Sequence, residues 1–381
     1  MRIAILGYGV VGGGVHALLR DGSLGMTVGR VLDRRVLPEL GPLRTAEIRD
    51  ILEDRSIDAV VEAIGGLHPA LDFVHAALCA GKHVVTSNKE MVSHAYAELT
   101  NLASAHGVQL RFSASVGGGI PWLHNLLRTA RGDRIRALRG IVNGTTNYIL
   151  DAMGGGADFG DALARAQALG FAEADPTADL EGLDAQRKCA ISASLAFGGA
   201  VAPDRVPALG IAAIRKADIE AFAARGLACR LMACAGAVAA GVYAYVEPTL
   251  VDAGSLEAQV KTNHNCIFLT AEALGDAAFY GQGAGRFPTA QNVVQDLLDI
   301  RDGLPASVPG TAPIPVRNGA ISHRYYIRTR LPLPEGLARE AWGEGVATNP
   351  MSVAEAHALA SRIRAEDAGA FFAGMGGGKQ P

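Results

Sequence analysis

The chain has 381 residues, a formal net charge of −3 and 47 glycines, and 49% of its residues are hydrophobic. This length predicts two or three domains with a large buried core. The net charge is not basic and no block of Lys and Arg occurs, which argues against a nucleic-acid partner. The five cysteines are scattered and odd in number, without a Cys-x-x-Cys pair. We therefore expect free thiols in a cytoplasmic protein, with neither disulfides nor a zinc site.

Membrane attachment is not expected either. The longest apolar run without a charge covers residues 231–246, and this is too short to span a bilayer comfortably. We interpret it as a pair of buried strands that turn near residues 239–241. The amino end enters a strand pattern at once, which leaves no room for a targeting segment.

Residues 2–6 form a short apolar run that predicts a buried strand, and residues 15–19 predict a helix. Between them lies a G-x-G-x-x-G motif made by Gly7, Gly9 and Gly12 around Val10 and Val11. In this context the glycines let the backbone approach a pyrophosphate, which the helix N-terminus then binds. The alternative is a plain strand-turn-helix unit that needs its glycines for packing.

The second predicted strand, residues 28–32, ends at Asp33, which is followed by Arg34 and Arg35. An acidic residue at this distance from the glycines binds the ribose 2′-hydroxyl of NAD, whereas an arginine accepts the 2′-phosphate of NADP. Both residue types are present, so the sequence predicts NADP or NAD without choosing between them.

Further strands are expected at residues 57–64, 83–86 and 110–113, separated by helical segments. Lys89 follows the strand at 83–86. Because ligands bind beyond the carboxyl ends of parallel strands, Lys89 is a candidate for contact with cofactor or substrate. The alternative is a solvated surface lysine. The alternation of strands and helices predicts a Rossmann-type dinucleotide-binding domain over residues 1–134, which we expect a helix within 286–304 to complete.

The rest of the chain predicts an α+β domain with a mixed sheet over residues 135–285, which we assign to substrate binding and dimerisation. A linker follows at 305–322, and a small segment with one evident strand and one helix occupies 323–381. The last residues, 374–381, have a composition typical of disorder. The fold class is therefore α/β, with two main domains.

One helix of the second domain carries the strongest polar signal. The helix predicted over residues 183–197 places Asp184 and Lys188 four residues apart on one face. A carboxylate beside an ammonium can orient a polar substrate and give it a proton. The alternative is an ordinary surface ion pair, which contributes little to stability.

The motifs together resemble homoserine dehydrogenase. The resemblance rests on the glycine motif at 7–12, Thr-Ser-Asn-Lys at 86–89, Ser-Val-Gly-Gly-Gly-Ile-Pro at 115–121, Asn-Gly-Thr-Thr-Asn-Tyr-Ile-Leu at 143–150, the acidic stretch 169–188 and Gly-Ala-Gly at 283–285. Each motif alone is weak, but all stand in the family's order over residues 1 to 302.

This resemblance implies reversible, NAD(P)-dependent reduction of L-aspartate 4-semialdehyde to L-homoserine, a small-molecule substrate, in threonine and methionine biosynthesis. It implies that Lys188 gives the proton, that Lys89 lies beside the reacting groups, and that Glu173 and Asp184 bind the substrate. Gly144, Gly170 and Gly283 would approach the cofactor. A homodimer or homotetramer is also expected.

Two departures from the family pattern affect these expectations. Family members commonly hold sodium with a glutamate at the position of Ser113 and with the carbonyls of Val116, Gly118 and Ile120. Serine removes the only charged ligand, so we expect weak sodium binding or none. The second departure is the tail, which is short for a βαββαβ fold of the ACT type and shows no middle strands. We regard it as a shortened ACT-like remnant, and the form as monofunctional.

Two other functions are alternatives to this one. A cysteine-dependent semialdehyde-type dehydrogenase would need a reactive thiol such as Cys266, but this residue lies in an apolar strand pattern. A cofactor-binding regulator with impaired catalysis is the second alternative. The presence of Glu173, Asp184 and Lys188 argues against it.

Overall fold

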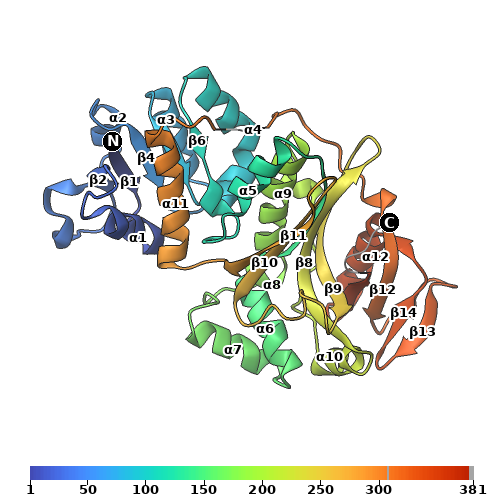
Figure 1. The fold of residues 1–381 in the computed structure, drawn as a ribbon. Coiled ribbons are helices and arrows are strands. Elements are labelled where there is room, and N and C mark those ends of the chain that lie inside the picture. Colours follow the sequence, from blue (N-terminus) through green and yellow to red (C-terminus); the bar gives the residue numbers. More distant parts are fainter. Residues whose placement is uncertain (307–308, 377–381) are drawn as a thin grey trace. The chain divides into compact units, whose positions relative to one another are not determined.

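The structure is a computed structural model that describes residues 1–306 and 309–376. The chain divides into two compact units, each built from several segments (Figure 1). Unit 1 comprises residues 1–132, 194–200 and 281–313, and unit 2 comprises residues 133–193, 201–280 and 314–381. Residues 314–381 thus group with the second unit.

Unit 1 contains a six-stranded sheet in the order β3-β2-β1-β4-β5-β6, and the pairs between neighbouring strands are parallel. The strands are β1 (Arg2–Leu6), β2 (Thr27–Leu32), β3 (Arg44–Thr45), β4 (Ala59–Glu62), β5 (His83–Thr86) and β6 (Leu110–Arg111). The helices are α1 (Val10–Leu19), α2 (Arg49–Leu52), α3 (Ala70–Cys79), α4 (Lys89–Ala105), α5 (Trp122–Ala130) and α11 (Arg286–Arg301). The parallel order confirms the predicted dinucleotide-binding fold.

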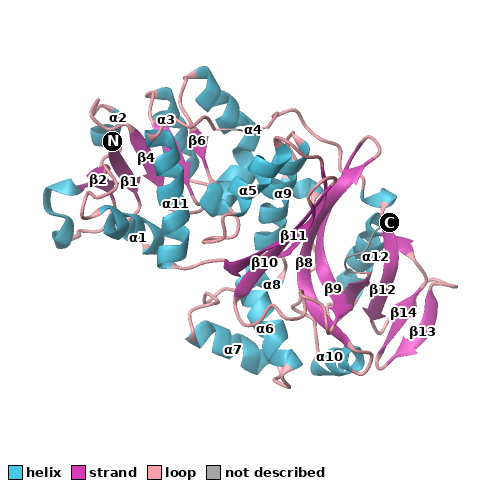
Figure 2. Ribbon diagram, viewed as in Figure 1, coloured by secondary structure: helices cyan, strands magenta, loops and turns pink. Residues whose placement is uncertain are grey.

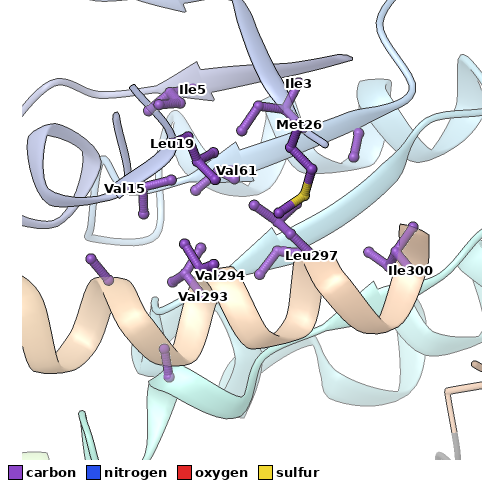
Figure 3. Packing of buried hydrophobic residues seen from close by; sticks show 14 of the residues in the cluster. Ile3, Ile5, Val15, Leu19, Met26, Val61, Val293, Val294, Leu297 and Ile300 are labelled. Carbon is purple, nitrogen blue, oxygen red and sulfur yellow. The ribbon is translucent and has the colours of Figure 1, made fainter. Parts of the chain in front are cut away.

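Helix α11 comes from a distant part of the sequence and packs into the core of unit 1. Val293, Val294 and Leu297 are buried in one cluster with Val15 of α1 and Ile5 of β1, and Figure 3 shows these side chains directed toward one another. Burial of each such side chain contributes about 1.5–3 kcal/mol. The fold of the glycine motif therefore depends on residues nearly 300 positions later in the chain.

Unit 2 is built on a ten-stranded mixed sheet (Figure 2), ordered β11-β10-β7-β8-β9-β16-β12-β14-β13, with β15 paired to β12. The strands are β7 (Ile135–Ile141), β8 (Leu227–Val238), β9 (Gly241–Asp252), β10 (His264–Ala271), β11 (Gly275–Gln282), β12 (Ser322–Arg328), β13 (Ala338–Trp342), β14 (Gly345–Thr348), β15 (Met351–Ser352) and β16 (Phe371–Met375). Strands β9 and β16 are parallel, whereas β7, β8, β9 and β10 pair antiparallel. The predicted mixed sheet is confirmed.

The apolar run at 231–246 forms the long hairpin of β8 and β9, as predicted. The two strands pair over their full length from Leu227 with Asp252 to Val238 with Gly241. Ala240 in the turn has a φ of 58°, a left-handed conformation that tight hairpin turns require.

The helices of unit 2 are α6 (Gly144–Gly154), α7 (Phe159–Ala168), α8 (Thr177–Leu180), α9 (Leu183–Phe197), α10 (Lys216–Ala223) and α12 (Val353–Glu366). Helix α6 begins at Gly144, because the side chain of Asn143 caps it by accepting from the Thr146 N–H.

The C-terminal segment corrects two expectations. Strands β13 and β14 form a hairpin beside β12, so the expectation of no middle strands is wrong. Residues 329–337, all described, contain no helix, and the first helix of a βαββαβ unit therefore has no counterpart. Gly374 and Met375 belong to β16 rather than to a disordered tail. The expected disorder of residues 377–381 lies outside the described residues.

In the described part of the chain, no helix is both long and apolar enough to cross a membrane.

Candidate functional site

The glycine motif of unit 1 has the geometry of an anion-binding turn. Gly7 has a φ of 91°, and a Cβ at Gly12 would lie 2.0 Å from the carbonyl oxygen of Gly7. A Cβ at Gly9, in contrast, would have no neighbour within 4 Å. Gly7 and Gly12 are thus required by the fold itself, whereas Gly9 leaves open space at the start of α1. The unpaired N–H groups of this helix end can bind a phosphate.

Asp33 directly follows β2 and contacts the backbone of the glycine motif. Its carboxylate accepts hydrogen bonds from the Tyr8 N–H at 2.9 Å and from Nη2 of Arg35 at 2.8 Å. The hydrogen bonds and charge of Arg35 hold the pKa of Asp33 well below its usual value despite partial burial. Arg34 is exposed. The ionised Asp33 is therefore partly neutralised by Arg35, and Arg34 adds a second cation at this edge.

A buried network that the sequence did not reveal sets the start of α4. Glu62, at the end of β4, is fully buried; it accepts from Oγ1 of Thr86 at 2.5 Å and from the N–H of Ile64 at 2.8 Å. Asn88 caps α4 by accepting from the Met91 N–H. These contacts fix the backbone immediately before Lys89, the first residue of the helix. The only sequence signal was an acidic residue inside an apolar strand.

The loop of residues 113–120 is held by side chains of α11. Ser113 donates its backbone N–H and its hydroxyl to Asp296, at 2.9 and 2.8 Å. The Asn292 amide donates to the carbonyls of Gly118 and Ile120, at 2.6 and 3.0 Å. Two of the three carbonyls expected to bind sodium are thus acceptors for a protein amide.

The same loop lies against the other segments of unit 1 that the sequence singled out. A Cβ at Gly118 would lie 2.4 Å from the carbonyl oxygen of Gly283, so the two predicted glycine loops touch. His124 of α5 places Nε2 3.3 Å from Asp296, whose hydrogen bond and charge raise the pKa of this imidazole above its usual value. His124, Asp296 and Asp299 could together offer metal ligands, but Arg111 forms an ion pair with Asp299 at 2.7 Å. A guanidinium at this distance disfavours a second cation.

In unit 2, Asp184 and Lys188 form the ion pair that the helical spacing predicts. Lys188 Nζ lies 2.7 Å from Oδ2 of Asp184 and 2.7 Å from the carbonyl oxygen of Val142. Lys188 is 9% exposed and Asp184 is 5% exposed, so this is not an ordinary surface pair. The ammonium has three hydrogens and two acceptors in the described chain, which leaves one hydrogen to direct at a substrate oxygen.

Two further polar residues join this pair, and neither is evident as a site residue from the sequence. Asn143 donates from Nδ2 to Asp179 at 2.6 Å and to Asp184 at 2.9 Å. Burial and the charge of Asp184 raise the pKa of Asp179, while hydrogen bonds from Asn143 and Thr145 oppose the shift. An Asn directly before a helix is a recognisable cap signal, but its contact with two carboxylates is purely tertiary.

Three other predicted residues lie on the segments around this cluster. A Cβ at Gly144 would lie 2.7 Å from the carbonyl oxygen of Asn263, and Gly170 has a φ of 73° without close neighbours. The hydroxyl of Thr145 donates to the carbonyl of Phe171 at 2.6 Å, which ties the start of α6 to the acidic stretch. Glu173 is exposed, and its carboxylate has no partner among the described residues. Among the described residues, the structure therefore pairs Asp184 with Lys188, whereas the Glu173 carboxylate bonds to neither of them.

Cys266 does not have the surroundings of a nucleophile. It lies on β10, is fully buried, and burial raises the pKa of its thiol to about 11. A nucleophilic cysteine needs a lowered pKa and access to substrate. The cysteine-dependent alternative therefore loses its candidate residue.

Comparisons with known proteins agree with these observations. Residues 7–113 match the family described as "Homoserine dehydrogenase, NAD binding domain", and residues 121–298 match the family described as "Homoserine dehydrogenase". A homoserine dehydrogenase of Corynebacterium glutamicum is 43% identical over 317 residues, which cover 78% of this chain and 71% of that protein.

Solved structures extend the similarity to nearly the whole chain. A homoserine dehydrogenase from Thiobacillus denitrificans has a TM-score of 0.87 at 33% identity, covering 99% of this chain and 98% of that one. A hyperthermophilic archaeal homoserine dehydrogenase in complex with NADPH has a TM-score of 0.69 at 25% identity, covering 80% of this chain and 98% of that one.

Proposed function

Because the chain belongs to the homoserine dehydrogenase family, we propose that the ammonium group of Lys188 protonates the aldehyde oxygen of its substrate. The protein is a nicotinamide-dependent oxidoreductase that interconverts L-homoserine and L-aspartate 4-semialdehyde in amino-acid biosynthesis. The observation that supports the role of Lys188 is its burial with two acceptors among the described residues, Asp184 and Val142, for three hydrogens.

The chemistry of the reaction requires such a group. A bound nicotinamide dinucleotide supplies the hydride to the carbonyl carbon, or accepts it in the reverse direction. As the hydride arrives, negative charge develops on the substrate oxygen, and a nearby ammonium stabilises this charge and donates the proton. Asp184 orients the Lys188 ammonium through a contact of 2.7 Å. In homoserine oxidation, Lys188 takes the proton back from the hydroxyl.

We assign substrate binding to Glu173 and Asp184 and a supporting catalytic role to Lys89. The exposed carboxylate of Glu173 is suited to the ammonium group of an amino acid. Lys89 begins α4 beyond the carboxyl end of β5, where parallel sheets bind ligands, and its charge would add to the field at the developing alkoxide. Asp184 would accept a hydrogen bond from the substrate hydroxyl.

The experiment that tests the role of Lys188 compares Lys188→Ala with the wild-type protein. We expect turnover to fall by about two to four orders of magnitude, the range of general acid catalysis. Dinucleotide affinity, measured by fluorescence titration, is expected to stay within a factor of about two. Equal losses of affinity and rate would contradict the assignment. Wild-type protein that binds the dinucleotide but fails to oxidise homoserine would instead support the impaired-regulator alternative.

We propose that NADP is the preferred dinucleotide. The charge of Asp33, which would repel a 2′-phosphate, is offset by its contacts with Arg35 and the Tyr8 N–H, and exposed Arg34 is available to pair with the phosphate. Arg34→Ala should raise KM for NADP by about tenfold and leave KM for NAD nearly unchanged. A parallel rise for both dinucleotides would contradict this role of Arg34.

We also propose that activity does not need sodium. The donor set does not fit the ion: Ser113 supplies no carboxylate, and the Gly118 and Ile120 carbonyls accept from Asn292. Initial rates in sodium chloride and in choline chloride of equal ionic strength should agree. A saturable rise in rate with sodium would overturn the proposal.

A homodimer formed through unit 2 and a cytoplasmic location remain our proposals. All five cysteines are free thiols, which suits a reducing compartment. Leu274 lies directly before β11 and Tyr280 lies within it, and both side chains are exposed. Because β11 is at one end of the sheet order, a partner subunit could cover them there. Light scattering on purified protein measures the oligomeric state directly.

A further inference from the structure

The amide of Asn143 has every hydrogen-bonding position occupied. Its Oδ1 accepts from the N–H and the hydroxyl of Thr146, both at 2.9 Å. Its Nδ2 donates to Asp179 at 2.6 Å and to Asp184 at 2.9 Å. An Asn side chain offers two acceptor and two donor positions, so this residue, which is 5% exposed, is fully satisfied. A side chain that served only as a helix cap would not need the two contacts to carboxylates.

The orientation of this amide follows from its partners. The Thr146 N–H can only donate, so the atom that faces it must be the amide oxygen. The NH₂ group must then face the two carboxylates. Because β7 ends at Ile141 and α6 begins at Gly144, the backbone on both sides of Asn143 is held in regular structure. The donor is therefore preorganised by the fold rather than by the carboxylates it binds.

The electrostatic situation explains why a donor is needed. Asp179 of α8 and Asp184 of α9 both bind the same NH₂ group, so two like charges lie close together in a largely buried site. One neighbouring cation is Lys188, whose Nζ shares Oδ2 of Asp184 with Asn143. Burial and Asp184 raise the pKa of Asp179, and the Asn143 hydrogen bond opposes this. Without these N–H groups, one carboxylate would take up a proton more readily.

We propose that Asn143 is a positioning residue of the reaction, which holds Asp179 and Asp184 side by side as anions and thereby fixes the direction of the Lys188 ammonium. This inference rests on the proposed role of Lys188, because Asn143 acts on the substrate only through its neighbours. Lys188 is held from two sides, by the carbonyl of Val142 and by Asp184. Asn143, the next residue after Val142, controls the second of these sides.

Asn143→Ser separates positioning from capping. Serine is as good an N-cap as asparagine, but it cannot donate to two carboxylates at once. Asn143→Asp keeps the shape and the cap oxygen, while it replaces the NH₂ group with a third negative oxygen. Asn147→Ser is the matched control, because Asn147 is a buried Asn of the same helix whose Nδ2 donates only to backbone carbonyls at 260, 262 and 264.

The measurement is the pH profile of kcat/KM for reduction of aspartate 4-semialdehyde. In this direction Lys188 must be charged, so the loss of rate on the acid side reports the carboxylates. The acid limb is the part of the profile where kcat/KM falls as the pH is lowered. We expect its midpoint to rise by about one pH unit in Asn143→Ser and further in Asn143→Asp. We expect kcat at its plateau to fall about ten- to a hundredfold, as for a slightly misplaced group. Asn147→Ser should lower thermal stability and leave the acid limb in place.

An acid limb at the wild-type position in folded Asn143→Ser would overturn the proposal and leave Asn143 as a cap. Should Asn143→Ser not fold, the same measurement on Asn143→Asp decides, with the same outcome against the proposal. If the proposed role of Lys188 is itself wrong, Lys188→Ala will show undiminished turnover. This result distinguishes a failure of that role from a failure of the Asn143 proposal. An altered profile in Asn147→Ser would also count against a specific role of Asn143.

Discussion

The attachment of the C-terminal segment to the sheet of unit 2 depends on one buried carboxylate, Glu247 of β9. It is 1% exposed. It receives hydrogen bonds from His323 at 2.8 Å and Tyr325 at 3.2 Å, both on β12, and from His357 of α12 at 3.0 Å. Gly374 of β16 completes the site, because a Cβ there would lie 2.3 Å from Oε1 of Glu247. We predict that this carboxylate is the main polar determinant of docking.

The size of the effect follows from what a substitution leaves behind. Glu247→Ala removes the acceptor of three buried donors and opens a cavity, which should cost about 3–5 kcal/mol in the free energy of unfolding. At about 2 °C per kcal/mol for a large domain, the melting temperature should fall by about 6–10 °C. The control is Glu340→Ala on β13, since Glu340 is exposed and its ion pair with Arg324 spans 3.8 Å. Its loss should cost less than about 0.5 kcal/mol.

The pKa of Glu247 sets the direction in which its contribution to stability changes with pH. Burial alone raises the pKa of Glu247, but the hydrogen bonds from His323 and His357 outweigh it and hold the pKa below the ordinary value of 4.5. A carboxylate with a lowered pKa stabilises the folded state above that ordinary value, and this contribution is lost as the pH falls through the folded-state pKa. The stability gap between wild type and Glu247→Gln should therefore shrink as the pH falls below 4.5.

Urea denaturation followed by circular dichroism, at several pH values, measures both effects. A loss in Glu247→Ala no larger than that in Glu340→Ala would contradict the assigned role of this carboxylate. A stability gap for Glu247→Gln that widens in acid would contradict it too, since that would mean the carboxylate is protonated in the folded protein.

Three other predictions follow from single contacts. Gly12→Ala should abolish dinucleotide binding in a fluorescence titration, because its Cβ would lie 2.0 Å from the carbonyl oxygen of Gly7; retained affinity would show that the turn can shift. Cys266→Ser should keep the wild-type kcat and lose about 1–3 kcal/mol of stability in urea, since a hydroxyl replaces a buried thiol; a large loss of kcat would revive the cysteine mechanism. Arg328→Met should cost about 3–5 kcal/mol in the same assay, because it leaves the buried carboxylate of Asp218, now 2.7 Å from Nε of Arg328, without its cation.

Most of the fold could be predicted from local sequence patterns. The glycine motif, the strand patterns of unit 1 and the helix at 183–197 depend on near neighbours in sequence, and the structure has them at nearly the predicted bounds. The errors occur where tertiary contacts decide. Strand β13 has exposed residues at four of its five positions, so its sequence lacks an alternating apolar pattern, and it forms because β14, itself paired with β12, offers it a free edge.

In the candidate site too, some residues could be predicted from local spacing and others could not. Asp184 and Lys188 were predictable because a spacing of four places them on one helix face. Asn143 and Asp179 were not, because they come together with Asp184 only when β7, α8 and α9 pack. A polar residue before a helix and an acidic residue near a proline are common in sequences, and neither indicates that the two side chains meet.

Ser113 shows why a departure from a family pattern needs its spatial partners for interpretation. The residue donates to both oxygens of Asp296, which is fully buried. A glutamate at 113 would place a second carboxylate beside Asp296, and two buried carboxylates require a cation or a shared proton between them. Serine removes that requirement, since a hydroxyl can donate to the remaining carboxylate. A serine at the position where the family resemblance implies a glutamate therefore also removes the electrostatic reason for a cation, and Asn292 supplies donors to the loop carbonyls.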